Sequence, residues 1–297
     1  MLDYYFSLLG DIPSFLEKYL KVPSLVRLKK VGYFCGMDYA SKDVYDFSEY
    51  ISRFDHSLTV ALLTYKFTKR KKDTISALFH DIATPCFSHV IDYMNKDYEK
   101  QESTEIYTEK ILREDTYLDE CLKKDHINIE DIINFKKYPV VDNDRPKMCA
   151  DRIDGVILTS IGWTKNITKE VIKQIVDDLT LYNNEAGEPE LGFKSISVAK
   201  RVKELSKQID LFCHSNEDNY MMELLANITR EVIFKKIINY DDLYYLNEDE
   251  LINIISKEPN DLYYKFKNIR KEDIPLVQMP NIKVRLLNPL VGSLRVK

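Results

Sequence analysis

The chain has 297 residues, of which 44% are hydrophobic and 31% charged, a composition typical of a soluble globular protein. At this length it can bury a full hydrophobic core without disulfides or structural metals, in one large domain or two modest ones. The net charge of −5 argues against a general affinity for nucleic acid, which binds to basic surfaces.

Helical periodicity runs through most of the chain, and Gly and Pro, which break helices, number only 8 and 10. A first helix is expected over 13–30, followed over 36–52 by a loop with a turn of helix. Further helices are expected at 56–69, 73–80, 86–94, 103–113, 147–161, 168–183, 196–213, 219–238 and 242–256, with two short amphipathic pieces in 116–137. The tail differs, because residues 282–287 alternate polar and apolar side chains before the turn at Asn288-Pro289, which predicts a small β element.

These patterns predict an all-α fold with a small β element near the C-terminus. We expect a helical core over 20–165 and a helical extension over 166–297 that packs on it, in one continuous unit with residues 1–19. The five cysteines form no metal-binding pattern, so reduced thiols in a cytoplasmic protein are the simplest explanation. The N-terminus does not resemble a signal peptide, and no apolar run is long enough to cross a membrane.

Two of the five histidines lie beside carboxylates at the edges of apolar helical segments. They are His56, which follows Asp55, and His80, which precedes Asp81; a third acidic element contains Asp151. An adjacent His-Asp pair offers a metal a neutral nitrogen and an anionic oxygen. Successive helical side chains diverge by about 100°, so the pair must lie at a helix end or along a curved wall. By itself the dipeptide is weak evidence, since polar residues at helix ends usually cap the helix.

Three motifs strengthen this interpretation: residues 53–58 read R-F-D-H-S-L, residues 80–92 read H-D-I-A-T-P-C-F-S-H-V-I-D, and residues 150–154 read A-D-R-I-D. They resemble the HD-domain metal-dependent phosphohydrolase superfamily, and most closely its dNTP triphosphohydrolase-like branch. The resemblance covers residues 20–165 well and continues weakly to about 256. It implies an HD-domain helical bundle with one metal ion, whose ligands are His56, His80, Asp81 and Asp151.

Such a set of nitrogen and oxygen ligands suits Mn, Fe, Co, Ni or Zn, and suits Mg less well. Four protein ligands leave an octahedral ion two positions for water and substrate, so the resemblance implies attack on phosphorus by a metal-activated water.

The chain departs from the pattern of that branch at several positions. Thr84 and Gln101 stand where the branch has two catalytic histidines, one of them its proton donor. Neither side chain titrates near neutral pH, so neither can act as a general acid. Gly155 and Thr159 replace a Tyr and a carboxylate that contact the sugar, and Tyr33 stands near the position of a Gln that reads the deoxyribose.

The phosphate-facing cations of the branch are retained as Arg53 and Arg152. Glu102 is a candidate general acid if an apolar environment raises its pKa, and a helix-capping residue otherwise. Asp154 is either a hydrogen-bond partner of a ligating His or an exposed helix residue. His126 is expected on the surface.

Two further residues of the second motif are candidates for the site. Asp92 matches a family carboxylate that orients a catalytic His; ion pairing or capping would explain it equally well. His89 matches a His near the substrate, with a buried, hydrogen-bonded His as the alternative. Thr84 and Tyr33 are expected to contact the substrate with His89.

We therefore expect hydrolysis of a nucleotide or another phosphoester. The alternative is a catalytically weak or inactive HD module that binds a nucleotide or phosphorylated ligand for regulation, which also fits the loss of both imidazoles. A di-iron oxygenase is disfavoured, because its additional histidines are not found at the required spacing. No membrane partner is expected, and homo-oligomers are common in the branch.

Overall fold

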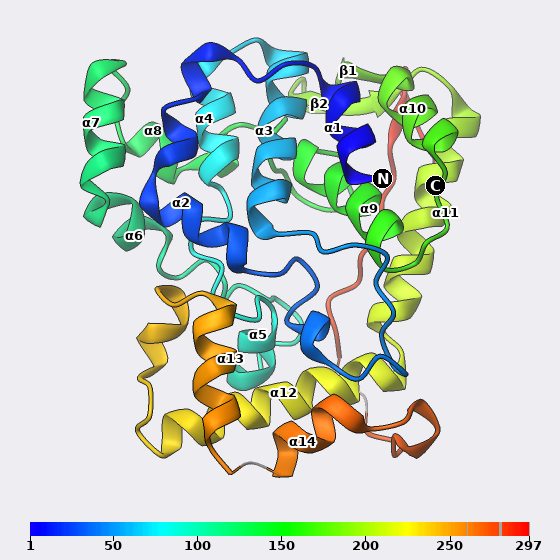
Figure 1. Ribbon diagram of the computed structural model, residues 1–297. Coiled ribbons are helices and arrows are strands. Elements are labelled where there is room, and N and C mark those ends of the chain that lie inside the picture. Colours follow the sequence, from blue (N-terminus) through cyan, green and yellow to red (C-terminus); the bar gives the residue numbers. More distant parts are fainter. Residues whose placement is uncertain (260, 279–280, 297) are drawn as a thin grey trace.

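The computed structural model describes residues 1–259, 261–278 and 281–296, and it confirms a helical fold with a small sheet (Figure 1). The α-helices are α1 (Leu2–Leu9), α2 (Pro23–Arg27), α3 (Arg53–Thr68), α4 (Lys71–Phe79), α5 (Val90–Asn95), α6 (Thr108–Glu114), α7 (Thr116–Lys124), α8 (Glu130–Ile133), α9 (Ala150–Gly162), α10 (Lys169–Asp178), α11 (Ile196–Cys213), α12 (Asn216–Phe234), α13 (Glu248–Lys257) and α14 (Asp261–Asn268). Short 3₁₀ turns cover Ser14–Leu16, Tyr19–Lys21, Leu28–Lys30, Met37–Tyr39, Phe135–Lys137, Tyr240–Tyr244 and Lys271–Asp273.

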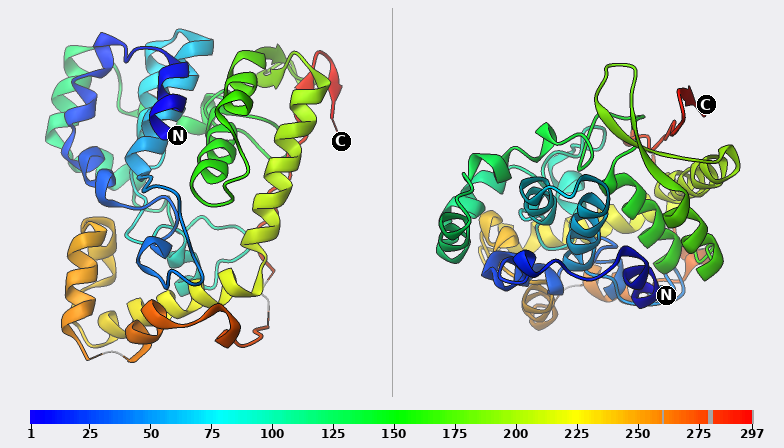
Figure 2. Two further views of the ribbon diagram at one scale, coloured as in Figure 1. Left: turned by 45° about the vertical axis from the view of Figure 1, so that its right-hand side comes forward. Right: turned by 90° about the horizontal axis from the view of Figure 1, so that it is seen from above.

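The helices form an upper and a lower group. In the upper group α3 packs against α4 and α9, and α11 packs against α9. In the lower group α12 packs against α5 and α14, with α13 beside them, as the left view of Figure 2 also shows. The division into 20–165 and 166–297 stays a prediction. Among the described helices, none combines the length and the hydropathy needed to cross a membrane.

The central helix α3 begins at a capping box and is buried nearly all round. The Ser52 hydroxyl accepts the Asp55 N–H, and the Asp55 carboxylate accepts the Ser52 N–H. The helix ends at Lys69, which takes the left-handed conformation with φ 55°. Because α3 has neighbours on most sides, its sequence shows no clean polar face, as expected for a helix inside a core.

Two glycines in α9 explain how the segment before α3 approaches it. A Cβ at Gly155 would lie 3.1 Å from the Tyr33 hydroxyl, and a Cβ at Gly162 would collide with the Phe34 ring. The two glycines are seven residues apart and so lie on the same side of the helix. Their small size therefore lets Tyr33 and Phe34 lie directly against α9.

The N-terminal region corrects one prediction, because residues 13–30 do not form a continuous helix. Pro23 starts α2, and it restricts Val22 to an extended backbone that interrupts the turns before it. The helices α1 and α14 were not predicted. The helix expected over 86–94 begins only at Val90, after two left-handed residues at Phe87 and Ser88.

The sheet is larger than predicted. The helix expected over 168–183 ends at Asp178, and the chain continues as β1 (Leu179–Asn183), which pairs antiparallel with β2 (Pro189–Phe193). Strand β3 (Leu290–Val291) joins β2 in parallel, and β4 (Leu294–Arg295) pairs antiparallel with β3. The turn between β1 and β2 contains Gly187, whose φ of 77° favours glycine.

The predicted β element at 282–287 is misplaced, since strand pairing starts only after Pro289. The N–H of Lys283 donates to the Tyr98 carbonyl, and the N–H of Arg285 donates to the Asp210 carboxylate. These contacts hold the segment against loops and helices instead of a strand. In Figure 1 the segment (red) runs from the lower helices to the sheet, and this path brings its side chains to the site described below.

Candidate metal site and its cavity

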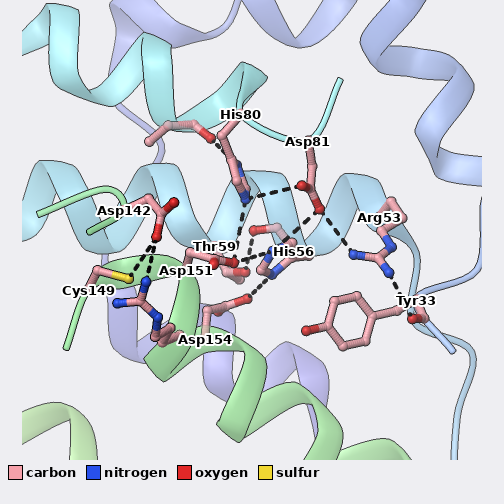
Figure 3. A network of polar contacts seen from close by, with 12 residues as sticks. Tyr33, Arg53, His56, Thr59, His80, Asp81, Asp142, Cys149, Asp151 and Asp154 are labelled. Carbon is pink, nitrogen blue, oxygen red and sulfur yellow. Dashed lines mark hydrogen bonds and ion pairs between the residues drawn. The ribbon is translucent and has the colours of Figure 1, made fainter. Parts of the chain in front are cut away.

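The four predicted metal ligands come together from three helix ends. His56 lies in the first turn of α3, His80 ends α4 with Asp81 beside it, and Asp151 lies in the first turn of α9. Beyond Phe79 the chain continues in tighter turns, in which the Ile82 N–H donates to the Phe79 carbonyl at 3.1 Å, so His80 and Asp81 lie at the end of the helix. Figure 3 shows all four side chains directed toward one point.

The distances between the four side chains are short enough for a shared ion. Asp151 Oδ1 lies 3.1 Å from His56 Nε2 and 3.6 Å from His80 Nε2, and these three residues place ligand atoms within 4.8 Å of one another. Asp81 lies slightly farther away, with one oxygen 3.7 Å from His56 Nε2 and the other 3.7 Å from His80 Nε2. Asp81 Oδ2 also pairs with Arg53 Nη1 at 3.1 Å.

Hydrogen bonds on the far side of each imidazole fix its ligating nitrogen. His80 Nδ1 lies 2.7 Å from the Ala77 carbonyl, which can only accept, so this nitrogen carries the proton. His80 Nε2 is then a buried lone pair, and within the described part of the chain it has no hydrogen-bond partner. His56 Nδ1 lies 2.7 Å from Asp154, which is fully buried and also accepts the Tyr5 hydroxyl at 2.7 Å. This geometry fits a divalent metal, since both histidines present Nε2 to the same point.

The charges of the site favour a cation. Burial by itself would lower the pKa of His56, but the carboxylates of Asp151 and Asp154 raise it to about 10. Burial would raise the pKa of Asp151, yet its close contacts with His56 and His80 hold it well below its usual range. A cluster that retains a proton so strongly has excess negative charge, which a divalent ion neutralises when it displaces that proton.

Arg53 is buried beside the metal cluster. Its Nε donates to Ser88 Oγ at 3.0 Å, and its guanidinium carbon lies 4.8 Å from the centre of the Tyr33 ring. Together with the ion pair to Asp81, these contacts hold the Arg53 guanidinium at the wall of the site. The Tyr33 ring in turn lies 5.1 Å from the His56 ring, and Figure 3 shows its hydroxyl directed toward the cluster.

Arg152 binds protein groups on the other side of the cluster. Its guanidinium donates to the Asp142 carboxylate at 3.0 Å, to the Lys147 carbonyl at 2.8 Å and to Asn143. These bonds fix the loop that precedes α9. A role for Arg152 in phosphate binding stays a prediction.

His89 and Asp92 form a hydrogen-bonded pair at the site. His89 Nδ1 lies 2.8 Å from Asp92 Oδ2, and the fully buried Asp92 also accepts the Ser103 N–H at 3.1 Å. The His89 side chain remains 29% exposed and contributes to the cavity wall. Asp92 therefore orients an imidazole, although the imidazole belongs to His89 and not to position 84.

Thr84 and Gln101, which stand where the resembling branch has histidines, also line the cavity. Thr84 is buried, and its carbonyl accepts Arg27 Nη2 at 2.7 Å. The side-chain oxygen of Gln101 accepts Arg285 Nη2 at 2.9 Å. Glu102 is exposed; its N–H donates to the Asp97 carboxylate at 2.9 Å and its carbonyl accepts the Glu105 N–H at 3.0 Å.

The cavity has a volume of about 340 Å³ and extends well beyond the metal cluster. Asp151, Gly155, Thr159 and Trp163 line it at four-residue spacing along one face of α9. At 1.5 Å per residue, the distance from Asp151 to Trp163 is about 18 Å along the helix. The remote parts of the wall were not predicted: Arg145, Lys283, Arg285, Asp218, Tyr45 and Phe47.

Comparison with known proteins identifies the segment that carries this cluster. Residues 53–156 match the HD domain. The matched segment begins at Arg53 and contains all four predicted metal ligands. It also contains the His89–Asp92 pair, whereas Tyr33 and Arg285 lie outside it.

Two relatives extend the comparison. The chain is 23% identical over 251 residues to the uncharacterized protein YdhJ of Bacillus subtilis, which covers 84% of this chain and 73% of that protein. It is 24% identical over 132 residues to the metal-dependent phosphohydrolase cns2 of Cordyceps militaris, which covers 44% of this chain and 37% of that protein. The similarity to the first relative thus reaches far beyond the HD domain.

Proposed function

We propose that this protein is a metal-dependent phosphohydrolase that acts on a nucleotide or a related phosphoester. The observation that carries the proposal is the convergence of the His56 and His80 Nε2 atoms on Asp151, within a segment that matches the HD domain. The name of the relative from Cordyceps militaris supports the same chemistry. The proposed ligands are His56, His80, Asp151 and Asp81.

A divalent ion at this point supplies positive charge to a phosphate group and lowers the pKa of water. The residues around it bind and orient the substrate. Arg53 holds Asp81 in place and adds a buried cation to the wall where a phosphate would bind. The Tyr33 hydroxyl has no hydrogen-bond partner in the described structure and is available to donate to a phosphate oxygen.

The proton for the leaving group is assigned to His89. Hydrolysis breaks the bond from phosphorus to the ester oxygen, and this oxygen must gain a proton as it leaves. An imidazole can carry this proton and Asp92 orients that of His89, whereas the side chains of Thr84 and Gln101 do not ionise. Glu102 at the rim is the second candidate for this step.

The dNTP triphosphohydrolase-like activity of the most similar branch stays a prediction, because its sugar contacts are replaced at Gly155 and Thr159.

The proposal is tested with purified protein, a panel of nucleotides and simpler phosphoesters, and Mn, Fe, Co, Ni, Zn and Mg in turn. We expect phosphate release with at least one ion, and its loss in His80→Ala together with the bound metal. Lys123→Ala on the exposed face of α7 is the matched control. Nucleotide binding without turnover on any substrate would contradict the enzyme and support the regulatory module.

His89 and Asp92 are tested separately from the metal ligands. His89→Asn should lower kcat about 10²- to 10⁴-fold, as is usual for loss of a general acid, with the metal content unchanged. It should also remove one limb of the pH profile of kcat. A variant with an unchanged kcat would exclude His89 as the proton donor and leave Glu102.

A further inference from the structure

The end of the cavity remote from the metal cluster has an aromatic wall. Phe34, Tyr45, Phe47 and Trp163 all line it. The rings of Phe34 and Phe47 stack with centres 4.5 Å apart and planes inclined by 6°, and Tyr45 lies 5.6 Å from Phe47 at 20°. The centres of the Trp163 and Tyr45 rings lie 6.0 Å apart. Such a wall suits a planar ring, since aromatic faces stack on one another.

A buried carboxylate, Asp218, lines the same end of the cavity. It lies in the first turn of α12 and is only 8% exposed. Its Oδ1 accepts the Tyr45 hydroxyl at 2.6 Å. For Oδ2, the described residues provide no hydrogen-bond partner. Because Asp218 lines the cavity and this oxygen keeps its lone pairs free, it is suited to accept a hydrogen bond from a ligand.

The charges near Asp218 leave its second oxygen available. The charge of Arg285 acts on Asp218, but the Arg285 guanidinium donates to Gln101 and to the Lys283 carbonyl and forms no ion pair with Asp218. Burial raises the pKa of Asp218 to about 7, although the Tyr45 hydroxyl and the charge of Arg285 lower it. Slightly above neutral pH the group is therefore a carboxylate that accepts hydrogen bonds.

The two ends of the cavity differ in chemistry and lie far apart. The proposed metal site lies beside Asp151, and Trp163 lies about 18 Å farther along α9. A volume of about 340 Å³ falls within the range of about 300–1,000 Å³ for small-molecule sites. A phosphate by itself would occupy only the end near Asp151, so the aromatic wall is available to the organic part of the substrate.

We propose that the substrate is a nucleoside phosphate whose base stacks on the aromatic wall and donates an N–H to Asp218 Oδ2. This inference rests on the proposed function, because it names the substrate class for the same cavity. It assigns recognition of the base to α12 and to residues 34–47, outside the matched HD domain. Asp218 is thereby a specificity-determining residue, and Tyr45 positions it.

The test compares 5′-AMP, N6,N6-dimethyl-5′-AMP and ribose 5-phosphate as substrates at pH 8. The dimethylated base has the same ring system but no N–H. For the unaltered protein we expect kcat/KM to be about 10- to 100-fold lower for the dimethylated nucleotide than for 5′-AMP, mainly through KM. Equal values for the two nucleotides would overturn the proposal.

Variants then assign this preference to Asp218. Asp218→Asn keeps the volume and can still accept the Tyr45 hydroxyl through its carbonyl, which puts an NH₂ group in place of Oδ2. The ratio of kcat/KM for 5′-AMP to that for the dimethylated nucleotide should fall to about one, because the NH₂ group of the new Asn side chain cannot accept the N–H of the base. Glu231→Gln on the same helix, outside the cavity wall, is the matched control and should keep the preference. An unchanged preference in Asp218→Asn would refute the role of Asp218.

A binding experiment separates this inference from the proposed function. Adenosine carries no phosphate, so its thermal shift reports the aromatic end without any hydrolysis. We expect a shift for the unaltered protein and a smaller one for Asp218→Ala and for N6,N6-dimethyladenosine. If no phosphoester is hydrolysed but this pattern holds, the hydrolase fails and the base site stands. If phosphate is released from ribose 5-phosphate but adenosine causes no thermal shift, the proposed hydrolase stands and the proposed base site is refuted.

Discussion

Asp154 provides a sharp test of the proposed metal site, because it contacts the predicted ligand His56 at Nδ1, the nitrogen that does not face the cluster. Its Oδ2 lies 2.7 Å from His56 Nδ1, its Oδ1 accepts the Tyr5 hydroxyl, and it is fully buried. Asp154→Asn keeps the volume but replaces one accepting oxygen by an NH₂ donor. Either Tyr5 loses its acceptor, or His56 moves its proton to Nε2 and can no longer ligate.

The magnitude follows from these two contacts. One buried donor without a partner costs about 1–3 kcal/mol of unfolding free energy. A displaced proton on His56 weakens metal binding, and loss of a partner behind a ligand typically costs about 10- to 100-fold in affinity. Tyr5→Phe is the matched control: it removes one hydrogen bond, costs about 1 kcal/mol, and leaves Asp154 to hold His56.

The measurement is Mn²⁺ affinity by titration, with urea unfolding in the presence of a chelator to separate stability from binding. We expect Asp154→Asn to lose affinity well beyond its loss of stability, and Tyr5→Phe to lose stability alone. If Asp154→Asn binds Mn²⁺ as tightly as the unaltered protein while His80→Ala does not, metal binding does not depend on the hydrogen bond between Asp154 and His56, and the reasoning is refuted.

Three further predictions concern other parts of the molecule. Gly162→Ala should lower the unfolding free energy by about 1–3 kcal/mol, because its methyl group meets the Phe34 ring; an unchanged urea midpoint would contradict this packing. Glu248→Gln should flatten the pH dependence of stability. Burial and the nearby Asp38 raise the pKa of Glu248 to about 8, so the folded state keeps a proton that the unfolded state loses, and the unaltered protein should lose stability as pH rises from about 4.5 to 8. Urea unfolding of both proteins at pH 5 and pH 8 checks the sign, and a parallel change in the two would refute it. Removal of the ion by EDTA should lower Tm, and Mn²⁺ should restore it, in the unaltered protein but not in His80→Ala.

The ligands that the sequence proposes for one end of the site lie in short motifs, and the fold brings these residues together. His80 and Asp81 are adjacent in the chain and lie at the end of α4. For Asp154 the sequence left two alternatives, a hydrogen-bond partner of a ligating histidine or an exposed helix residue, and its burial against His56 supports the first. The geometry of that end is therefore largely local.

The other end could not be predicted in this way, because residues from four distant segments form it. Asp218, Arg285, Trp163 and Tyr45 share no motif, and their neighbours reveal nothing about a cavity. The helix predicted over 168–183 failed for a related reason: after Asp178 the chain pairs with β2 and, through β2, with β3 about 100 residues later. Such contacts depend on the tertiary fold, which local periodicity does not report.

Gly155 links the two ends of the cavity. In the resembling branch this position carries a Tyr that packs on the sugar, whereas here the Tyr33 hydroxyl lies 3.1 Å from where a Cβ would be. An aromatic ring is thus supplied from before α3 instead of from α9. Phe34, the next residue, packs against Gly162. The dipeptide Tyr33-Phe34 thus contacts the metal end of the cavity through Tyr33 and forms the start of the aromatic wall through Phe34. A shift of this dipeptide would therefore alter substrate choice and the surroundings of His56 together. For this reason Gly155→Ala should change KM for nucleotides more than metal affinity, since none of the four predicted ligands contacts position 155 directly.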